Sequence, residues 1–150
     1  MAGKGVTILG VFVADLAFWT GRLPAMGETV MGREFKLGPG GKGSNQAIAA
    51  RRAGAEVTFI SKLGADNFGA LARQTYKDEG ISERFVYESR DTGTGAAAIL
   101  VNHDSGENAI VVAMGAVADL TVAEVEAAEA AIAGAAVFAT NLELPIELAM

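Results

Sequence analysis

The sequence predicts an α/β fold with a mainly parallel sheet. The chain has 150 residues, of which 51% are hydrophobic and 20% are charged, so it can bury a core. Apolar runs recur at 6–13, 57–63 and 135–140, and such runs are typical of strands covered on both faces. Segments with a helical pattern separate them, and strand–helix alternation favours parallel pairing.

The first elements lead into a glycine-rich segment. Val6–Val13 is rich in β-branched residues and predicts a buried strand, and Thr29–Leu37 predicts a half-exposed one. The segment LGPGGKGSN follows, and then a helix is expected from about Asn45 to Ala53, with Gly54 as its stop. The glycines therefore join a strand to the start of a helix.

The middle of the chain predicts a strand, a helix and a hairpin. The run at 57–63 predicts a second buried strand, and 67–79 predicts a helix that Gly80 ends. The apolar segments at 95–102 and 108–115 flank HDSGE, which indicates a hairpin. Because the early extended segments and this hairpin do not fit pure alternation, we expect them to form a separate small sheet.

The last part predicts one more helix–strand unit. Thr121 and Glu124 match a capping box for a helix that reaches about Ile132. The run at 135–140 predicts a strand, and 141–150 is expected to begin another helix. The predicted parallel sheet has only a few strands, and the sequence stops within the last expected helix. We therefore expect a shortened piece of a longer polypeptide.

Composition excludes several classes of function. The formal net charge of −6 argues against a nucleic-acid partner, which favours a basic surface. The chain has no cysteine and a single histidine, His103, which we expect in a turn, so no cysteine or imidazole metal site is predicted. Asp15 interrupts the amino-terminal apolar run, which is too short to span a bilayer. We therefore expect a cytoplasmic protein without a membrane partner.

The glycine segment partly matches a dinucleotide-binding fingerprint. Gly38, Gly40 and Gly43 satisfy G-x-G-x-x-G and precede a helix. The fingerprint normally follows a buried parallel strand, whereas the strand expected here is polar. A second match begins at Gly93 and precedes a strand. Dinucleotide binding therefore remains an alternative with little support.

A neutral, hydroxyl-rich ligand suits the same loop better than a phosphate cradle. A P-loop needs glycine at position 36 and serine or threonine at 43, but the sequence has Lys36 and Gly43. Glycines allow a close backbone approach, Lys42 can donate, and Asn45 can donate and accept. Asp15, expected at the end of the first strand, can accept from hydroxyls at the carboxyl edge of the sheet.

These motifs resemble a known family. GGKGSNQA at 40–47, with Asp15 upstream and GETVMG between them, resembles the amino-terminal signature of the ribokinase (PfkB) family of carbohydrate kinases. KLGADNFG at 62–69 resembles its G-x-D-x-x-G element, TGTGAAAILVNHDSGENAIVVAMGA resembles its central strands, and NLELP resembles its L-E-x-P. The resemblance runs in order along nearly all of the chain.

The resemblance implies a fold and a reaction. The fold is a ribokinase-like three-layer α/β/α arrangement with a small β-sheet lid, here from about 16–37 and 96–113, and residues 1–150 form the sugar-binding portion of one domain. The reaction is ATP-dependent phosphorylation of a sugar or nucleoside hydroxyl, with Mg²⁺ required and a monovalent cation as a further candidate. A homodimer through the lid is the expected protein partner, and Trp19 is expected to pack in the lid.

The resemblance also assigns the site. The residues at the sugar-contacting positions are Asp15, Gly41, Lys42, Asn45 and Glu143. No catalytic residue is expected in this chain, because the family's G-A-G-D motif, with its base, and the ATP pocket would follow Met150. We therefore expect residues 1–150 alone to be inactive.

Two departures leave the substrate open. Ribokinases usually have asparagine two residues before the aspartate, where this chain has Val13. They also usually have a G-A-N motif, which here reads G-A-V and has Val117 as its third residue. Both changes remove polar groups, so another sugar or a nucleoside is as consistent as ribose. A sugar-binding module without catalysis remains the main alternative function.

Overall fold

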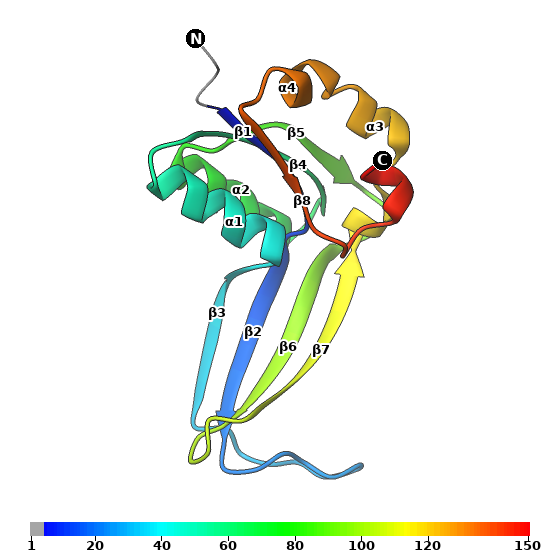
Figure 1. Ribbon diagram of the computed structural model, residues 1–150. Coiled ribbons are helices and arrows are strands. Elements are labelled where there is room, and N and C mark those ends of the chain that lie inside the picture. The colour runs from blue at the N-terminus through cyan, green and yellow to red at the C-terminus, as the bar shows by residue number, and fades with distance from the viewer. Residues whose placement is uncertain (1–4) are drawn as a thin grey trace.

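The computed structural model describes residues 5–150 and contains two four-stranded sheets (Figure 1). Sheet A has the order β5-β4-β1-β8, and all its neighbours run parallel. Its strands are β1 (Gly5–Leu9), β4 (Glu56–Gly64), β5 (Ser82–Ser89) and β8 (Val137–Thr140). The predicted α/β class with a mainly parallel sheet is confirmed.

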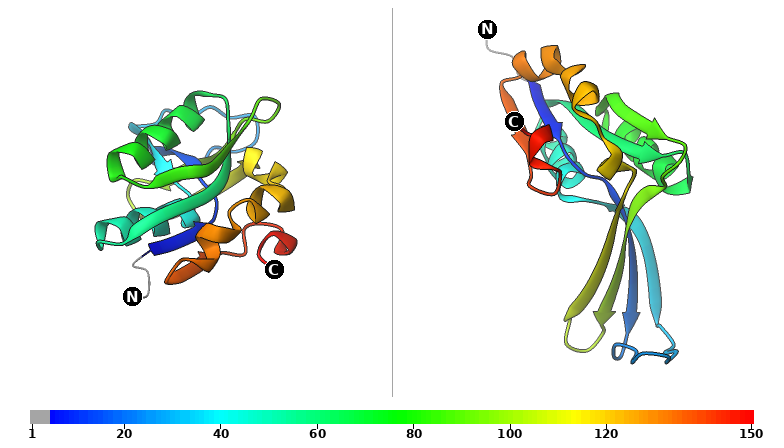
Figure 2. Two further views of the ribbon diagram at one scale, coloured as in Figure 1. Left: turned by 90° about the horizontal axis from the view of Figure 1, so that it is seen from above. Right: turned by 90° about the vertical axis from the view of Figure 1, so that its right-hand side faces the viewer.

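Helices cover both faces of sheet A (Figure 2). Helices α1 (Lys42–Arg52) and α2 (Asn67–Glu79) share one core cluster with Ile8 of β1. Helices α3 (Val122–Glu126) and α4 (Glu129–Ala133) lie against the cluster that contains Leu9. Because neighbouring residues of a strand face opposite sides, the two helix pairs lie on opposite faces and give three layers.

Sheet B projects away from this body (Figures 1 and 2). Its order is β3-β2-β6-β7, from β2 (Val13–Thr20), β3 (Glu34–Gly40), β6 (Thr94–Asn102) and β7 (Asn108–Gly115). The β2–β3 and β6–β7 pairs are antiparallel, and the central β2–β6 pair is parallel. Sheet B is therefore built from two separate segments of the chain. Strands β2 and β3 lie between β1 and α1 in the sequence, and β6 and β7 lie between β5 and the short 3-10 helix Ala116–Asp119.

The prediction of one strand over Val6–Val13 is wrong. β1 ends at Leu9, and β2 begins at the last residue of the predicted run. The chain crosses between the sheets at this break, where a Cβ on Gly10 would lie 2.7 Å from the Cα of Gly43. As a result, Asp15 lies inside a strand of sheet B and does not end a strand of sheet A.

The next strand also differs from its predicted bounds. β3 begins at Glu34, later than the expected Thr29, and continues through the glycines to Gly40. Pro39 is accommodated because β3 pairs only with β2, and an edge strand tolerates the missing N–H. The first part of the glycine segment is therefore strand and not loop.

Most of the start and stop signals predicted for the helices are confirmed. Helix α2 has the predicted bounds, and Gly80 ends it in the left-handed conformation at φ 68°. Thr121 and Glu124 form the predicted capping box, but the helix breaks after Glu126 into α3 and α4. The helix expected from residue 141 is only the 3-10 turn Ile146–Leu148. No helix within residues 5–150 is both long and apolar enough to cross a membrane.

Candidate functional site

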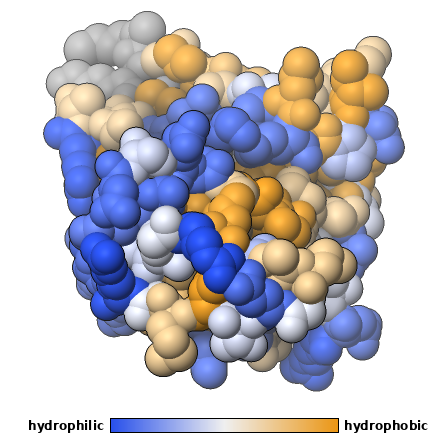
Figure 3. Space-filling model, turned by 90° about the horizontal axis from the view of Figure 1, so that it is seen from below, coloured by the Kyte–Doolittle hydropathy of each residue, from blue (hydrophilic) through white to orange (hydrophobic). Residues whose placement is uncertain are grey.

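A cavity of about 200 Å³ lies where the carboxyl edge of sheet A meets the end of sheet B that adjoins it, called here the root of sheet B. Figure 3, which views the molecule from below, shows apolar side chains gathered between hydrophilic ones near the middle of this face. The cavity brings together all five residues predicted to contact a sugar, although their role in binding stays a prediction. Its lining is Val11, Val13, Asp15, Gly41, Lys42, Asn45, Ala97, Ile99, Ile110, Val112, Met114 and Glu143.

Asp15 supplies a carboxylate from the centre of sheet B. It lies in β2 opposite Gly38 of β3 and Ala97 of β6. Its carboxylate occupies the space above Gly40, where an added Cβ would overlap it. Among residues 5–150 no group donates a hydrogen bond to this carboxylate, and burial raises the pKa of Asp15 above its ordinary value of 3.8. Its oxygens are therefore free to accept from ligand hydroxyls.

The glycine turn brings the start of α1 against the crossing between the sheets. Gly41 has φ 90° and ψ 131°, and a Cβ there would overlap the carbonyl oxygen of Val11. A Cβ on Gly43 would lie 2.6 Å from the Cα of Gly10. The N–H of Ser44 donates to the same Val11 oxygen over 3.1 Å. Only glycine fits this backbone contact, which forms one wall of the cavity.

An ion pair closes the other side of the cavity. The Lys42 ammonium donates to Oε1 of Glu143, and so joins the first residue of α1 to the segment after β8. The Lys42 side chain is 72% exposed and that of Glu143 is 28% exposed. Asn45 lies one turn further along α1, exposed at the rim. This wall therefore offers an ammonium and an amide as donors.

Buried polar atoms that lack hydrogen-bond partners among the described residues lie at the last residue of β8 and just after it. Oε2 of Glu143, Oγ1 of Thr140 and both polar atoms of the Asn141 amide are buried and lack a hydrogen bond to residues 5–150. Sequence reasoning included Glu143 but missed Thr140 and Asn141. Because buried polar groups in native proteins almost always have partners, this segment is expected to meet a ligand, water or further protein.

The remaining wall of the cavity is apolar. Val13, Ile99, Ile110 and Val112 come from the face of sheet B that lies over the site. Val13, at the position where the resemblance led us to expect asparagine, therefore presents apolar surface to the cavity. Val117 is fully buried in the core beside α3 and does not line the cavity. The site thus combines polar groups at one end with apolar surface at the other.

The glycine segment lacks the structural context of a dinucleotide fingerprint. The strand before it is β3, an antiparallel edge strand of sheet B. The fingerprint instead needs a parallel strand that leads directly to a helix N-terminus. The second match at Gly93 leads into β6 and not into a helix.

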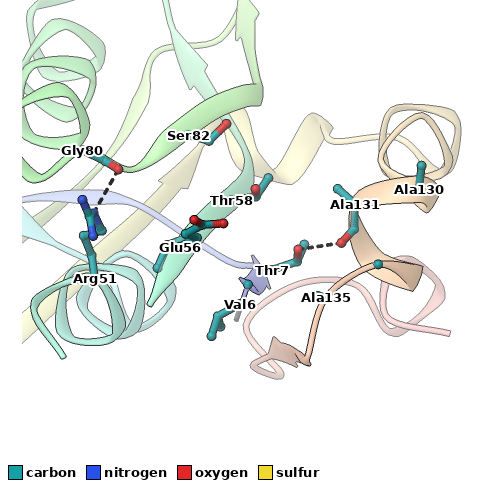
Figure 4. Close-up of a pocket in the computed structure, with 13 residues that line it drawn as sticks. Val6, Thr7, Arg51, Glu56, Thr58, Gly80, Ser82, Ala130, Ala131 and Ala135 are labelled. Atoms are coloured by element: carbon teal, nitrogen blue, oxygen red, sulfur yellow. Dashed lines mark hydrogen bonds between the residues drawn. The ribbon is translucent and has the colours of Figure 1, made fainter. Parts of the chain in front are cut away.

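Two other features of the described residues do not form a candidate site. A hollow of about 440 Å³ lies at the amino-terminal edge of sheet A (Figure 4). There Arg51 already donates to the carbonyl oxygens of Gly80 and Ala55, and the Thr7 hydroxyl donates to Ala131. Within residues 5–150 no cluster of three or more His, Asp or Glu side chains could hold a metal ion. The described residues therefore do not fit a magnesium site.

Comparisons with known proteins agree on one family. The description "pfkB family carbohydrate kinase" matches residues 4–146. The chain is 40% identical to the ribokinase of Mus musculus over 93% of its own length and 43% of that protein. It is 31% identical to the deoxyribokinase of Salmonella typhi, over 95% of the chain and 46% of that protein.

Solved structures give the same result. The structure of Arabidopsis thaliana ribokinase complexed with ribose and ATP is similar with a TM-score of 0.83 and 26% identity, over 99% of this chain and 48% of that one. The chain thus spans less than half the length of each of these proteins.

Proposed function

The chain belongs to the pfkB family of carbohydrate kinases, and on this premise we propose that the complete protein phosphorylates a hydroxyl of a ribose-type sugar with ATP. The observation that carries the proposal is the cavity in which Asp15, Lys42, Asn45 and Glu143 meet beside Gly41. The relatives named ribokinase and deoxyribokinase support a pentose as substrate. A nucleoside, which carries the same sugar, remains the second substrate class.

The polar residues of the cavity have complementary roles in this proposal. Asp15 accepts from two sugar hydroxyls, and both of its oxygens are available because neither accepts a hydrogen bond from residues 5–150. Lys42 and Asn45 donate to sugar oxygens, while the free Oε2 of Glu143 accepts from a further hydroxyl. Gly41 lets the backbone approach the sugar. Together these contacts would hold one hydroxyl in position for attack, which is a large part of catalysis.

The phosphoryl transfer itself is assigned to residues outside this chain. The hydroxyl oxygen bonds to the γ-phosphorus as the bond to the β–γ bridging oxygen breaks, and a general base takes the hydroxyl proton. Mg²⁺ would neutralise charge on the phosphates, but the described residues do not fit it. We propose that the base, the ATP pocket and the metal ligands all lie beyond the described sugar-binding portion.

Calorimetry on the complete protein tests the sugar assignment. Asn45→Ala should weaken sugar binding about 5-fold, because one net hydrogen bond contributes roughly 1 kcal/mol. Gln46→Ala is the matched control, since Gln46 is the next exposed residue of α1 and does not line the cavity. Both variants should bind an ATP analogue normally. Loss of nucleotide affinity with unchanged sugar affinity would show that the glycine turn is a phosphate cradle.

A substrate panel separates the candidate functions. Magnesium-dependent ATP turnover would be measured with ribose, 2-deoxyribose, fructose and adenosine. Turnover with one of these supports a kinase and identifies its substrate class. Heat of sugar binding without any turnover would instead indicate a binding module. Val13 presents apolar surface to the cavity, so ribose and 2-deoxyribose should be compared directly.

We also propose that a second copy of the chain covers the exposed apolar surface of sheet B. Phe18 and Phe35 stack with ring centroids 4.8 Å apart, and Phe35, Leu37 and Val111 are each about half exposed or more. Light scattering should give the mass of a dimer, and Phe35→Asp should give a monomer. A cytoplasmic location remains a prediction.

A further inference from the structure

Asp66 connects the body of the molecule to sheet B. It is the N-cap of α2, and its Oδ1 accepts from the N–H of Gly69 over 2.8 Å. Its second oxygen, Oδ2, accepts over 2.7 Å from the N–H of Thr94. Because Thr94 is the first residue of β6, one carboxylate binds the start of a body helix and the root of a central strand of sheet B.

Thr94 strengthens this connection through its own side chain. Its hydroxyl oxygen accepts from the N–H of Gly64 over 2.8 Å, and the residue is only 7% exposed. Gly64 is the last residue of β4. Thr94, at the start of β6, is therefore hydrogen-bonded both to Gly64 at the end of β4 and to Asp66 at the start of α2.

The backbones at this junction are in direct contact. A Cβ on Gly64 would lie 2.5 Å from the nitrogen of Thr94, and one on Gly69 would overlap the carbonyl oxygen of Gly64. A Cβ on Gly115, at the end of β7, would overlap the carbonyl oxygen of Gly93. The glycines bring these backbones together beside the side chains of Asp66 and Thr94, so the hydrogen bonds of Asp66 act directly on the backbone position of β6.

The position of β6 in turn determines the geometry of the cavity. Ala97 and Ile99 of β6 line the cavity, and Ala97 is the register partner of Asp15 in the parallel β2–β6 pair. Thr94 lies only three residues before Ala97. A change at the root of β6 would therefore alter the position of the Asp15 carboxylate over the glycine turn.

We propose that Asp66 is a positioning residue for the sugar cavity. Its hydrogen bonds hold sheet B at the angle that places Asp15 over the ligand. The inference rests on the proposed function for its kinetic consequences. Burial acts to raise the pKa of Asp66, but the N–H groups of Gly69 and Thr94 outweigh it and lower the pKa below its ordinary value. The carboxylate is therefore ionised at neutral pH, and both hydrogen bonds are charge-assisted.

The variant Asp66→Asn separates positioning from helix capping. Asparagine caps a helix about as well as aspartate, so it can keep the bond from Gly69. Its amide nitrogen cannot accept from Thr94, so the bond to β6 is lost. We expect the KM for sugar in the complete protein to rise about 10-fold, because a displaced Asp15 would lose one charged hydrogen bond to the sugar. The KM for ATP should stay within twofold.

Thr121→Ala is the matched control. Thr121 caps α3 through the N–H of Glu124 over 3.3 Å and has no hydrogen bond to sheet B. This variant should lower the melting temperature and leave the KM for sugar unchanged. If Asp66→Asn behaves in the same way, Asp66 is only a helix cap and the proposal is wrong.

Amide hydrogen exchange provides a test that does not depend on activity. In Asp66→Asn, exchange should become faster at Thr94 and along β6, while the amides of β1 and β4 should be unchanged. Uniformly faster exchange, or a change confined to α2, would overturn the proposal. If the protein shows no sugar-dependent turnover, the proposed function fails, but the exchange result still decides the role of Asp66. Should Asp66→Asn not fold, Thr94→Val removes the acceptor of the Gly64 N–H. It should give faster exchange along β6 and, within β4, only at its last residue, Gly64.

Discussion

Replacing Asp15 by asparagine should have opposite effects on sugar binding and on stability. The substitution keeps the shape of the side chain but removes its charge and one of its two acceptor oxygens. Asp15 receives no hydrogen bond from residues 5–150, and burial raises its pKa. The carboxylate therefore contributes nothing favourable to the ligand-free fold that asparagine would lose.

The loss on the sugar side can be estimated from one hydrogen bond. A hydrogen bond to a charged group contributes roughly 1.5–3 kcal/mol, which corresponds to about 10- to 150-fold in kcat/KM. The Asp15→Asn variant should lose this much with its best substrate. Positioning of the reacting hydroxyl also depends on this contact, so kcat should fall together with sugar affinity.

The stability effect follows from the direction of the pKa shift. A carboxyl whose pKa is raised in the folded state stabilises the fold when protonated and loses this contribution as pH rises through the raised pKa. At pH 7 Asp15→Asn should therefore melt at a higher temperature than the parent protein. The difference should disappear below the ordinary pKa of 3.8, where the carboxyl is protonated in both states.

Steady-state kinetics, calorimetry and thermal unfolding together check this prediction. Asp104→Asn, in the exposed turn between β6 and β7, makes the same change of charge away from the cavity and should affect neither quantity. An unchanged kcat/KM across the sugar and nucleoside panel would refute the role of Asp15. A lower melting temperature at pH 7 would refute the argument from burial.

Three further predictions concern other parts of the chain. Residues 1–150 alone should show no magnesium-dependent ATP turnover with any sugar, and measurable turnover would contradict the assignment of catalysis to other residues. Gly41→Ala should cost roughly 1–3 kcal/mol of stability from backbone strain and abolish sugar binding in calorimetry. Gly38→Ala should be tolerated because nothing lies within 4 Å of its added Cβ; equal losses in both variants would contradict this. Asn141→Leu should raise the melting temperature of the 1–150 chain, since it removes a buried amide that has no hydrogen bond to residues 5–150; a lower melting temperature would indicate a missed partner.

The body of the fold was predictable because its signals are local. Buried strands appear as apolar runs, and α2 carries both its Asp66 cap and its Gly80 stop in the sequence. The crossing at Gly10 gave no such signal, because the residues on both sides of it are buried and apolar. Strand β5 was missed because it lies at the edge of sheet A and its apolar run covers only residues 85–87, with charged residues on both sides.

The residues that line the candidate site were predictable from the resemblance, but their neighbours were not. Asp15 and Lys42 are 27 positions apart in the sequence, and only the folded chain brings them to one cavity with Glu143. The apolar wall from β6 and β7 depends on which face of sheet B turns inward, which strand alternation alone leaves open. The unpaired Asn141 amide likewise depends on packing that no local pattern reveals.

The parallel pairing of β2 with β6 has a consequence for protein synthesis. Residue 14 pairs with residue 96, so the first hairpin, β2–β3, leaves the ribosome long before its central partner strand exists. At about 5–20 residues per second, roughly 60 residues of further translation leave this apolar hairpin without its neighbour for about 3–12 seconds. An exposed strand edge of this kind readily pairs with other chains. We therefore expect the yield of folded protein to depend on whether a chaperone shields the nascent hairpin until residue 102 has emerged.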